Sequence, residues 1–207
     1  MEFALTVNGL ALRVRSPDPA LVTPVREALN ASYREHAPFL EWALEQTSEE
    51  RALASMLRAQ DDFASETGER RLFIVTEDGQ AVVGCIGLVP RRRKRYVVGY
   101  WANSAFAGKG YLREVLQQLL KRWPEFTFYL TTSSANTRSQ RLAEAAGFTL
   151  IRIHSQTRQS SQHGVQNTWV YRFGGKRQAK KARGRARANR SFLNERADCT
   201  VLIERGQ

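Results

Sequence analysis

Apolar and polar residues alternate along the first segment of the chain, from residue 3 to residue 14. Every second side chain is apolar on both sides of an Asn8-Gly9 pair. A period of two is typical of a β-strand with one buried face, and Asn-Gly is the strongest short signal for a hairpin turn. We therefore expect two antiparallel strands joined at Asn8-Gly9.

Two helical patterns follow. Apolar side chains recur every four residues from Leu21 to Tyr33, which is the spacing of one helix face. Further along, Ser48 precedes two glutamates, and apolar residues continue at helical spacing to about Ala64. A serine at the N-cap and acidic residues in the first turn both stabilise the start of a helix. We expect a helix in each of these two segments.

Strand patterns then return. Residues 71–76 and 82–88 are apolar runs on either side of a Glu77-Asp78-Gly79 turn, and residues 96–101 form a third run after the basic segment Arg91–Arg95. Short apolar runs bounded by turn residues are typical of buried strands. The sequence predicts two consecutive hairpins, the second with the basic segment at its tip.

The pattern changes after residue 101. A glycine-rich segment at 107–110 is followed by apolar residues at helical spacing from Tyr111 to the Trp123-Pro124 pair. The remaining expected elements are a strand at 126–132, a helix at 136–146 ended by Gly147, and strands at 148–153 and 168–173. The expected fold class is therefore mixed α and β.

Composition favours one packed domain. The chain has 207 residues, of which 42% are hydrophobic, enough for a single core with a tail. The two cysteines, Cys85 and Cys199, do not form a disulfide framework or a zinc-binding pattern, so we expect no metal. No apolar run approaches the ~20 residues of a membrane helix, and the start of the chain lacks the pattern of a signal peptide. We expect a cytoplasmic protein without a membrane partner.

Positive charge is concentrated in two segments. The chain has 32 Lys and Arg against 20 Asp and Glu, a formal net charge of +12. Residues 176–207 hold +7 of that charge, most of it between Lys176 and Arg190, and Arg91–Arg95 is the densest run elsewhere. Such clusters favour phosphate, so nucleic-acid contact through Arg91–Arg95 and Lys176–Arg190 is an expectation. A solvated face and a disordered tail are the alternative interpretation.

The glycine-rich segment lies where an expected strand passes into an expected helix. A helix start leaves backbone N–H groups without partners and places the positive end of the helix dipole there. Phosphate binds readily at such a junction. Two familiar phosphate motifs do not fit, because a third glycine is missing from the dinucleotide pattern and Gly108-Lys109-Gly110 lacks the Ser or Thr of a P-loop.

The glycine loop is one of several motifs that occur in a fixed order. The others are Gly99-Tyr100-Trp101, Asn136-x-x-Ser139, Ala145-Ala146-Gly147-Phe148 and an aromatic segment at residues 36–42. With these motifs, residues 8–173 resemble the GNAT N-acetyltransferases, most closely the RimJ/RimL branch that acetylates ribosomal-protein N-termini. The resemblance implies an α/β (α+β) fold with a splayed, mixed and mostly antiparallel sheet over residues 1–175, followed by a basic tail at 176–207.

The resemblance also implies acetyl-CoA in the splay of the sheet, with its pyrophosphate on the N–H groups of the glycine loop. Asn136 would bond the pantetheine arm, and an amide of the 100–102 strand would bind the oxyanion. The implied cofactor-binding residues are Tyr100, Trp101, Ala102, Ala107, Gly108, Lys109, Gly110, Tyr111, Leu112 and Asn136. Ala107 and Leu112 depart from the usual family pattern, which is compatible with binding because backbone groups form the cradle.

For catalysis the resemblance implies direct attack of an amine on the thioester, with Ser139 protonating or hydrogen-bonding the leaving sulfur. The general base is less defined, because residues 149–173 contain no Asp or Glu. Glu41, beside the aromatic Phe39 and Trp42, is the candidate, and His154 is the second. A solvated helix charge is the other interpretation of Glu41.

Several acetyl acceptors stay open. A protein N-terminus is the leading one, because an α-amine with a pKa of ~7.7–8.0 is partly neutral near pH 7, whereas a lysine at ~10.4 is not. The α-amine of an aminoacyl-tRNA and a small-molecule amine are the alternatives, and so is a non-catalytic acetyl-CoA-binding module. The apolar residues 198–204 suit docking on another subunit, as in a homodimer.

Overall fold

The computed structural model describes residues 2–174. Expectations for residues 176–207, the basic cluster Lys176–Arg190 and the docking segment 198–204 included, lie outside the described residues. None of the helices within residues 2–174 is both long enough and apolar enough to cross a membrane.

The secondary structure alternates between strands and helices. The strands are β1 Phe3–Val7, β2 Leu10–Arg15, β3 Arg70–Thr76, β4 Val82–Arg91, β5 Arg95–Ala102, β6 Thr127–Ser133, β7 Thr149–Ser160 and β8 Gly164–Gly174. The α-helices are α1 Val22–Ala31, α2 Tyr33–His36, α3 Glu49–Ala64, α4 Tyr111–Lys121 and α5 Thr137–Ala145, and short 3-10 helices lie at Pro19–Leu21 (η1) and Ser104–Phe106 (η2).

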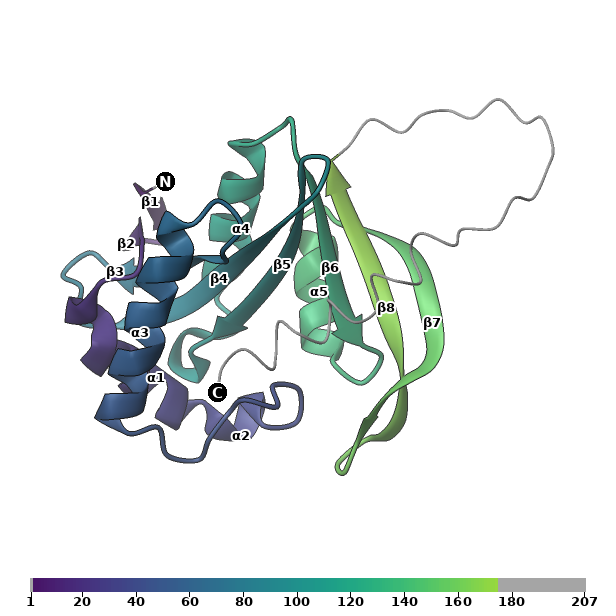
Figure 1. Ribbon diagram of the computed structural model, residues 1–207, viewed down its shortest axis with the longest axis horizontal. Helices are drawn as coiled ribbons and strands as arrows, with labels where there is room; N and C mark the ends of the chain where they lie inside the picture. The colour runs from purple at the N-terminus through teal and green to yellow at the C-terminus, as the bar shows by residue number, and fades with distance from the viewer. Residues whose placement is uncertain (1, 175–207) are drawn as a thin grey trace.

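The eight strands of the described chain form one sheet in the order β1-β2-β3-β4-β5-β6-β8-β7 (Figure 1). Every neighbouring pair is antiparallel except β5 and β6, which are parallel. A parallel pair needs a long crossover, and here it consists of η2, the glycine loop and α4. The expected fold class, a mixed and mostly antiparallel sheet flanked by helices, is confirmed.

Most elements begin and end close to where the sequence pattern predicts. Asn8-Gly9 forms the first hairpin turn, with both residues at positive φ, 49° and 82°. The Ser48 side chain caps α3 by accepting from the Arg51 N–H. The Asn136 side chain likewise caps α5 by accepting from the Ser139 N–H.

Two predictions needed correction. The helix expected through Tyr33 breaks at Ser32, whose fully buried hydroxyl accepts from the Ser104 N–H at 2.9 Å; a bond to this distant segment pulls the chain out of the helix. The last two strands are longer than their apolar runs, because polar side chains extend the β7–β8 hairpin. Thr157 Oγ1 donates to Thr168 Oγ1 at 2.8 Å, and Gln166 Nε2 donates to Ser160 Oγ at 2.8 Å.

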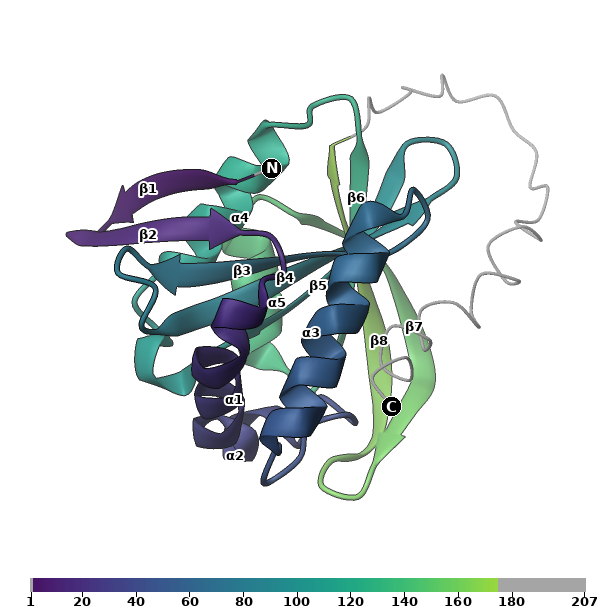
Figure 2. The same cartoon turned by 60° about the vertical axis from the view of Figure 1, so that its left-hand side comes forward.

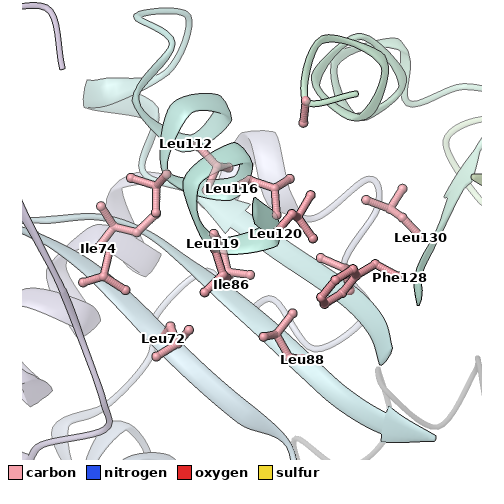
Figure 3. Close-up of a cluster of buried hydrophobic side chains, with 14 of the residues drawn as sticks. Leu72, Ile74, Ile86, Leu88, Leu112, Leu116, Leu119, Leu120, Phe128 and Leu130 are labelled. Carbon is pink, nitrogen blue, oxygen red and sulfur yellow. The ribbon is translucent and has the colours of Figure 1, made fainter. Parts of the chain in front are cut away.

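Helices cover both faces of the sheet (Figure 2), and the alternation along each strand determines what each face buries. On β3, Leu72 and Ile74 face α4 and α5, whereas Phe73 and Val75 face α1 and α3. The core beneath α4 consists of leucines of that helix packed on aliphatic residues of β3 and β4 (Figure 3). This packing fixes α4, and with it the glycine loop at its N-terminus, on the sheet.

The sheet opens between β5 and β6. Their ladder covers only Arg95–Val98 against Thr127–Leu130. Beyond it, β5 continues to Ala102 on β4, and β6 continues to Ser133 on β8. The two strands therefore diverge at their C-terminal ends (Figure 1), which produces the expected splay.

Candidate active site

The splay exposes backbone groups of β5. His36 bonds the Ala102 carbonyl from the side of β5 away from β4, and the next residue, Asn103, turns its N–H to Val83 on β4. Backbone groups alternate in direction along a strand, so the N–H of Tyr100 also faces away from β4. The β6 ladder ends before this residue, at Val98. The segment of β5 at residues 100–102, which the sequence predicts to supply the oxyanion donor, thus directs the Tyr100 N–H into the opening.

Side chains from the α1–α2 segment hold the end of β5. The His36 Nε2 donates to the Ala102 carbonyl at 2.9 Å, and Ser32 accepts from the Ser104 N–H. Burial lowers the pKa of His36, which keeps the imidazole neutral near pH 7. Sequence reasoning gave neither residue a role; the available signal was two polar residues one helical turn apart on an otherwise apolar face.

The aromatic pair Tyr100 and Trp101 divides between the two faces of the sheet. The Trp101 ring packs with the α1–α3 core and lies 5.8 Å from the His36 ring. The Tyr100 ring belongs to the opposite core, under α4 and α5. The Trp101 ring therefore lies on the α1–α3 face, and its backbone lies opposite Cys85 of β4.

The glycine loop forms a cradle with no capping side chain. Gly108 and Gly110 have φ values of 77° and 80°, a left-handed region that glycine enters without strain. Gly110 is the N-cap of α4 and supplies no side-chain cap, so the N–H groups of the first turn are left for a ligand. Ala107, Gly108 and Lys109 are exposed. This arrangement fits an anion such as a pyrophosphate.

Lys109 turns back onto its own loop. Its ammonium donates to the Ala105 carbonyl at 3.3 Å and lies 5.9 Å from the centre of the Phe106 ring. The positive charge is thus held beside the cradle.

The other side of the splay is the N-terminus of α5. The oxygen of the Asn136 amide accepts from the Ser139 N–H at 3.0 Å, so the cap uses only one end of the amide. Gln140 Nε2 donates to the carbonyls of Ser133 and Ser134 at 2.9 and 3.0 Å, and the Ser133 hydroxyl donates to the buried Gln166. These bonds tie the first turn of α5 to the end of β6 and to β8.

Tyr100 and Ser139 meet across the splay. The Tyr100 hydroxyl donates to the Ser139 carbonyl at 3.0 Å and lies 3.0 Å from the Ser139 hydroxyl oxygen. Because the phenol has one proton, the Ser139 hydroxyl donates to the phenol oxygen in this arrangement. Burial raises the pKa of Tyr100 to about 12, so the phenol is neutral near pH 7. The structure thus brings these two predicted site residues into contact.

The two candidate bases lie on different elements. Glu41 is exposed in the segment between α2 and α3. Its neighbours tie this segment to both sides of the opening: the Phe39 ring stacks 5.1 Å from the His163 ring of the β7–β8 turn, and the Trp42 ring lies 6.4 Å from the His36 ring. His154 is half-buried on β7, opposite Thr168 of β8. Ser139 lies on a third element, α5, where its hydroxyl contacts Tyr100.

Other reactive groups lie apart from the splay. Cys85 is buried, which raises the pKa of its thiol to about 12 and leaves it a poor nucleophile near neutral pH. Across the described part of the chain, no group of three or more His, Cys, Asp or Glu residues is arranged to hold a metal ion.

Solved structures share this fold. RimL, a ribosomal L7/L12 α-N-protein acetyltransferase in complex with coenzyme A, has a TM-score of 0.69 at 18% identity, over 83% of this chain and 97% of RimL. The microcin C7 self-immunity acetyltransferase MccE, in complex with acetyl-CoA and AMP, has a TM-score of 0.71 at 16% identity, over 79% and 92%.

A third similar structure is the ribosomal-protein-S5-alanine acetyltransferase from Vibrio fischeri, with a TM-score of 0.67 at 13% identity, over 83% of this chain and 96% of the enzyme. No curated protein matches the chain in sequence. At sequence identities of 13–18%, these structures show that the chain shares their fold and nothing further.

Replacing His36 by Gln will weaken the pH dependence of stability. An unfolded histidine titrates near ~6.5, and burial lowers the pKa of His36 in the folded chain. Between these two pKa values the unfolded state binds more protons than the folded state. The contribution of neutral His36 to the free energy of unfolding is therefore present above pH ~6.5 and is lost as the pH falls toward the pKa of the folded state. Denaturant unfolding at pH 7.5 and 5.5 will show a smaller acid loss in His36→Gln than in the wild type.

His163→Gln, at an exposed position, is the matched control and keeps the wild-type acid loss. An equal acid loss in His36→Gln and the wild type would contradict the role of burial at His36.

The family assignment rests on a match in sequence, independent of the structural similarity. A family model described as the acetyltransferase (GNAT) domain matches residues 12–149, which is most of the chain and includes the glycine loop, Asn136 and Ser139. The sequence motifs predicted this family, and the splayed sheet has the arrangement expected of it. The chain belongs to the GNAT family and is an acyl-CoA-dependent acetyltransferase.

Proposed function

We propose that this protein transfers the acetyl group of acetyl-CoA to the α-amine of a protein N-terminus. The observation that carries the proposal is the end of the β5–β6 ladder at Val98, with the uncapped N-terminus of α4 on one side and Ser139 on the other. A donor with a phosphate end and a thioester end fits these two features together.

The glycine loop would hold the pyrophosphate through the N–H groups of residues 108–112, because the Ala107 N–H already donates to the Ser104 carbonyl at 3.2 Å. The left-handed Gly108 and Gly110 and the uncapped first turn of α4 support this role. Asn136 would bond the pantetheine arm through the amide nitrogen that its cap to Ser139 does not use. Backbone groups of Tyr100 and Ala102 would line the path between them, whereas those of Trp101 face Cys85 of β4.

Bound acetyl-CoA supplies an activated thioester. The Tyr100 N–H, directed into the opening, would stabilise negative charge on the thioester oxygen. The Ser139 hydroxyl would turn from the Tyr100 phenol oxygen to hydrogen-bond or protonate the leaving sulfur, and a proton released by the amine would replace any that Ser139 gives up. The neutral Tyr100 phenol would hold Ser139 in place by donating to its carbonyl. Glu41 would accept the proton of the incoming amine, directly or through water, with His154 as the second candidate.

The acceptor class rests on two supports. An α-amine with a pKa of ~7.7–8.0 needs less help from a base than a lysine at ~10.4. Solved acetyltransferases of ribosomal proteins share the fold over most of this chain. A small-molecule amine is the second candidate acceptor, since the self-immunity acetyltransferase MccE, which does not carry a ribosomal-protein description, shares the fold.

The basic hairpin would dock a macromolecular acceptor at a distance from the chemistry. Arg92, Arg93 and Lys94 are exposed at the turn between β4 and β5. Arg95 and Ala102 are seven steps apart along an extended strand, so the hairpin lies ~23 Å from the open end of the splay. This distance suits an RNA-associated protein whose flexible N-terminus reaches the site.

Two further expectations are kept as proposals. Residues 1–175 would form the catalytic domain, followed by a basic tail at 176–207 that adds to nucleic-acid contact. We also propose a cytoplasmic location, as for an enzyme that acts on newly made or ribosomal proteins. A homodimer stays a prediction.

Ser139→Ala will lower kcat by roughly 10²–10³-fold with acetyl-CoA affinity nearly unchanged, because it removes the proton donor to the leaving group and leaves the loop intact. Tyr100→Phe will lower kcat by a smaller factor, since it removes the two hydrogen bonds between the phenol and Ser139 but leaves the Ser139 hydroxyl in place. The measurements are steady-state kinetics and calorimetric binding of acetyl-CoA. Ser65→Ala, at an exposed serine after α3, is the control. A loss seen only in KM for Ser139→Ala would disprove the role.

Arg92→Glu combined with Arg93→Asn will weaken binding of the macromolecular acceptor and leave acetyl-CoA binding unchanged. Asn is chosen at position 93 because Arg93 has a φ of 61°, which Asn tolerates. Each phosphate contact gives binding a log–log salt slope of about −0.7 to −0.9, so losing two contacts will flatten the slope by roughly 1.5. The assay is acetylation of ribosomes and of free peptides at several salt concentrations.

The matched control for this pair is Arg58→Glu with Arg51→Asn, which makes the same charge change on the exposed face of α3. Salt-insensitive turnover on every acceptor, or full ribosome acetylation by the hairpin variant, would favour the small-molecule amine instead.

A further inference from the structure

The turn of the first hairpin touches the glycine loop. Asn8 Nδ2 donates to the Lys109 carbonyl at 2.8 Å, across 101 residues of sequence. The same amide nitrogen lies 3.9 Å from the point where a Cβ of Gly110 would stand. Asn8 is therefore in direct contact with the peptide that joins Lys109 to Gly110, at the N-cap of α4.

We infer that Asn8 is a positioning residue for acetyl-CoA binding, which fixes the Lys109–Gly110 peptide so that its N–H faces the pyrophosphate. The inference rests on the proposed role of the glycine loop. The first hairpin, which lies outside the motifs that carry the family resemblance, would thus help to form the cradle.

The geometry of a peptide bond gives the direction. There is no cis peptide bond among the described residues. In the trans peptide between Lys109 and Gly110, the C=O and the N–H therefore lie in one plane and point in opposite directions. A hydrogen bond that holds the carbonyl toward the hairpin must turn the N–H away from it. Gly110, with its left-handed φ of 80°, accepts this orientation without strain.

Strand β1 is placed to carry this contact. It lies against α4, and the Arg122 guanidinium at the far end of the helix stacks 3.9 Å above the Phe3 ring. From Phe3 to Asn8 an extended strand spans ~17 Å, and from Gly110 to Arg122 a helix spans ~18 Å, so the strand is as long as the helix. With Val7 buried in the core, the hairpin holds its turn at the N-terminus of α4 (Figure 2).

The turn and the contact place separate demands on residue 8. Asn8 has a φ of 49°, which glycine adopts as readily as asparagine. Asn8→Gly therefore keeps the hairpin turn and removes only the side-chain amide. Asn8→Asp keeps the size and the tolerance of this φ, but replaces the donor by a carboxylate beside a carbonyl and close to the bound phosphates.

The experiment compares two acetyl donors on each variant. S-acetylpantetheine has the thioester and the pantetheine arm of acetyl-CoA but no pyrophosphate. Acetyl-CoA binding is measured by calorimetry, and kcat/KM is measured with both donors. For Asn8→Gly we expect acetyl-CoA to bind roughly five- to tenfold more weakly, as for the loss of one hydrogen bond, with kcat at saturation and kcat/KM for S-acetylpantetheine unchanged.

Asn8→Asp will weaken acetyl-CoA binding more than Asn8→Gly, again with little effect on S-acetylpantetheine. The control is Thr6→Ala, which changes an exposed side chain on the same hairpin away from Lys109 and keeps wild-type values for both donors. Wild-type acetyl-CoA affinity in Asn8→Gly would overturn the inference. So would an equal loss with both donors, which would mean that Asn8 only stabilises the fold.

A different result would identify a failure of the proposed function. If the wild type used acetyl-CoA no better than S-acetylpantetheine, the glycine loop would not bind pyrophosphate at all, and both the cradle and the role of Asn8 would be rejected.

Discussion

The end of the β5–β6 ladder at Val98 is the constraint on which the site depends. A sheet that stayed paired to its end would satisfy the backbone of Tyr100 internally and leave no space between the strands. Divergence leaves polar groups unpaired, and such groups are costly unless a ligand or a side chain satisfies them. The protein thus gives up strand pairing where a thioester is proposed to bind.

Side chains from distant segments hold the diverging ends. His36 and Ser32 fix the end of β5 from the α1–α2 segment, while Asn136 and Gln140 fix the end of β6 through the first turn of α5. The glycine loop has its own support in Asn8. Each bond holds a backbone group in one direction before any ligand arrives, which lowers the entropic cost of binding.

The sequence predicts the local elements and the family well. The Asn8-Gly9 turn, the Ser48 cap and the glycine loop depend on residues a few positions apart, so a local pattern contains them. The contact of Tyr100 with Ser139 and the support from His36 join segments that only the folded chain brings together. The break at Ser32 was missed because a hydrogen bond to the distant Ser104 overrode periodicity. The extension of β7 and β8 was missed because polar side chains, which give no apolar pattern, bond across the hairpin.

The most direct measurement of the central claim is calorimetric titration of acetyl-CoA into Gly110→Val. Gly110 has a φ of 80°, which a β-branched valine does not adopt without strain, so valine must distort the loop even if the Arg113 guanidinium, 3.3 Å from the new Cβ, moves aside. Gly79→Val is the control, since its φ of 72° imposes similar backbone strain in a turn where a Cβ meets no atom within 4 Å. We expect binding to weaken at least ~100-fold in Gly110→Val, as for the loss of several hydrogen bonds to a charged ligand, and to stay at the wild-type level in Gly79→Val. Wild-type affinity in a folded Gly110→Val would contradict the account.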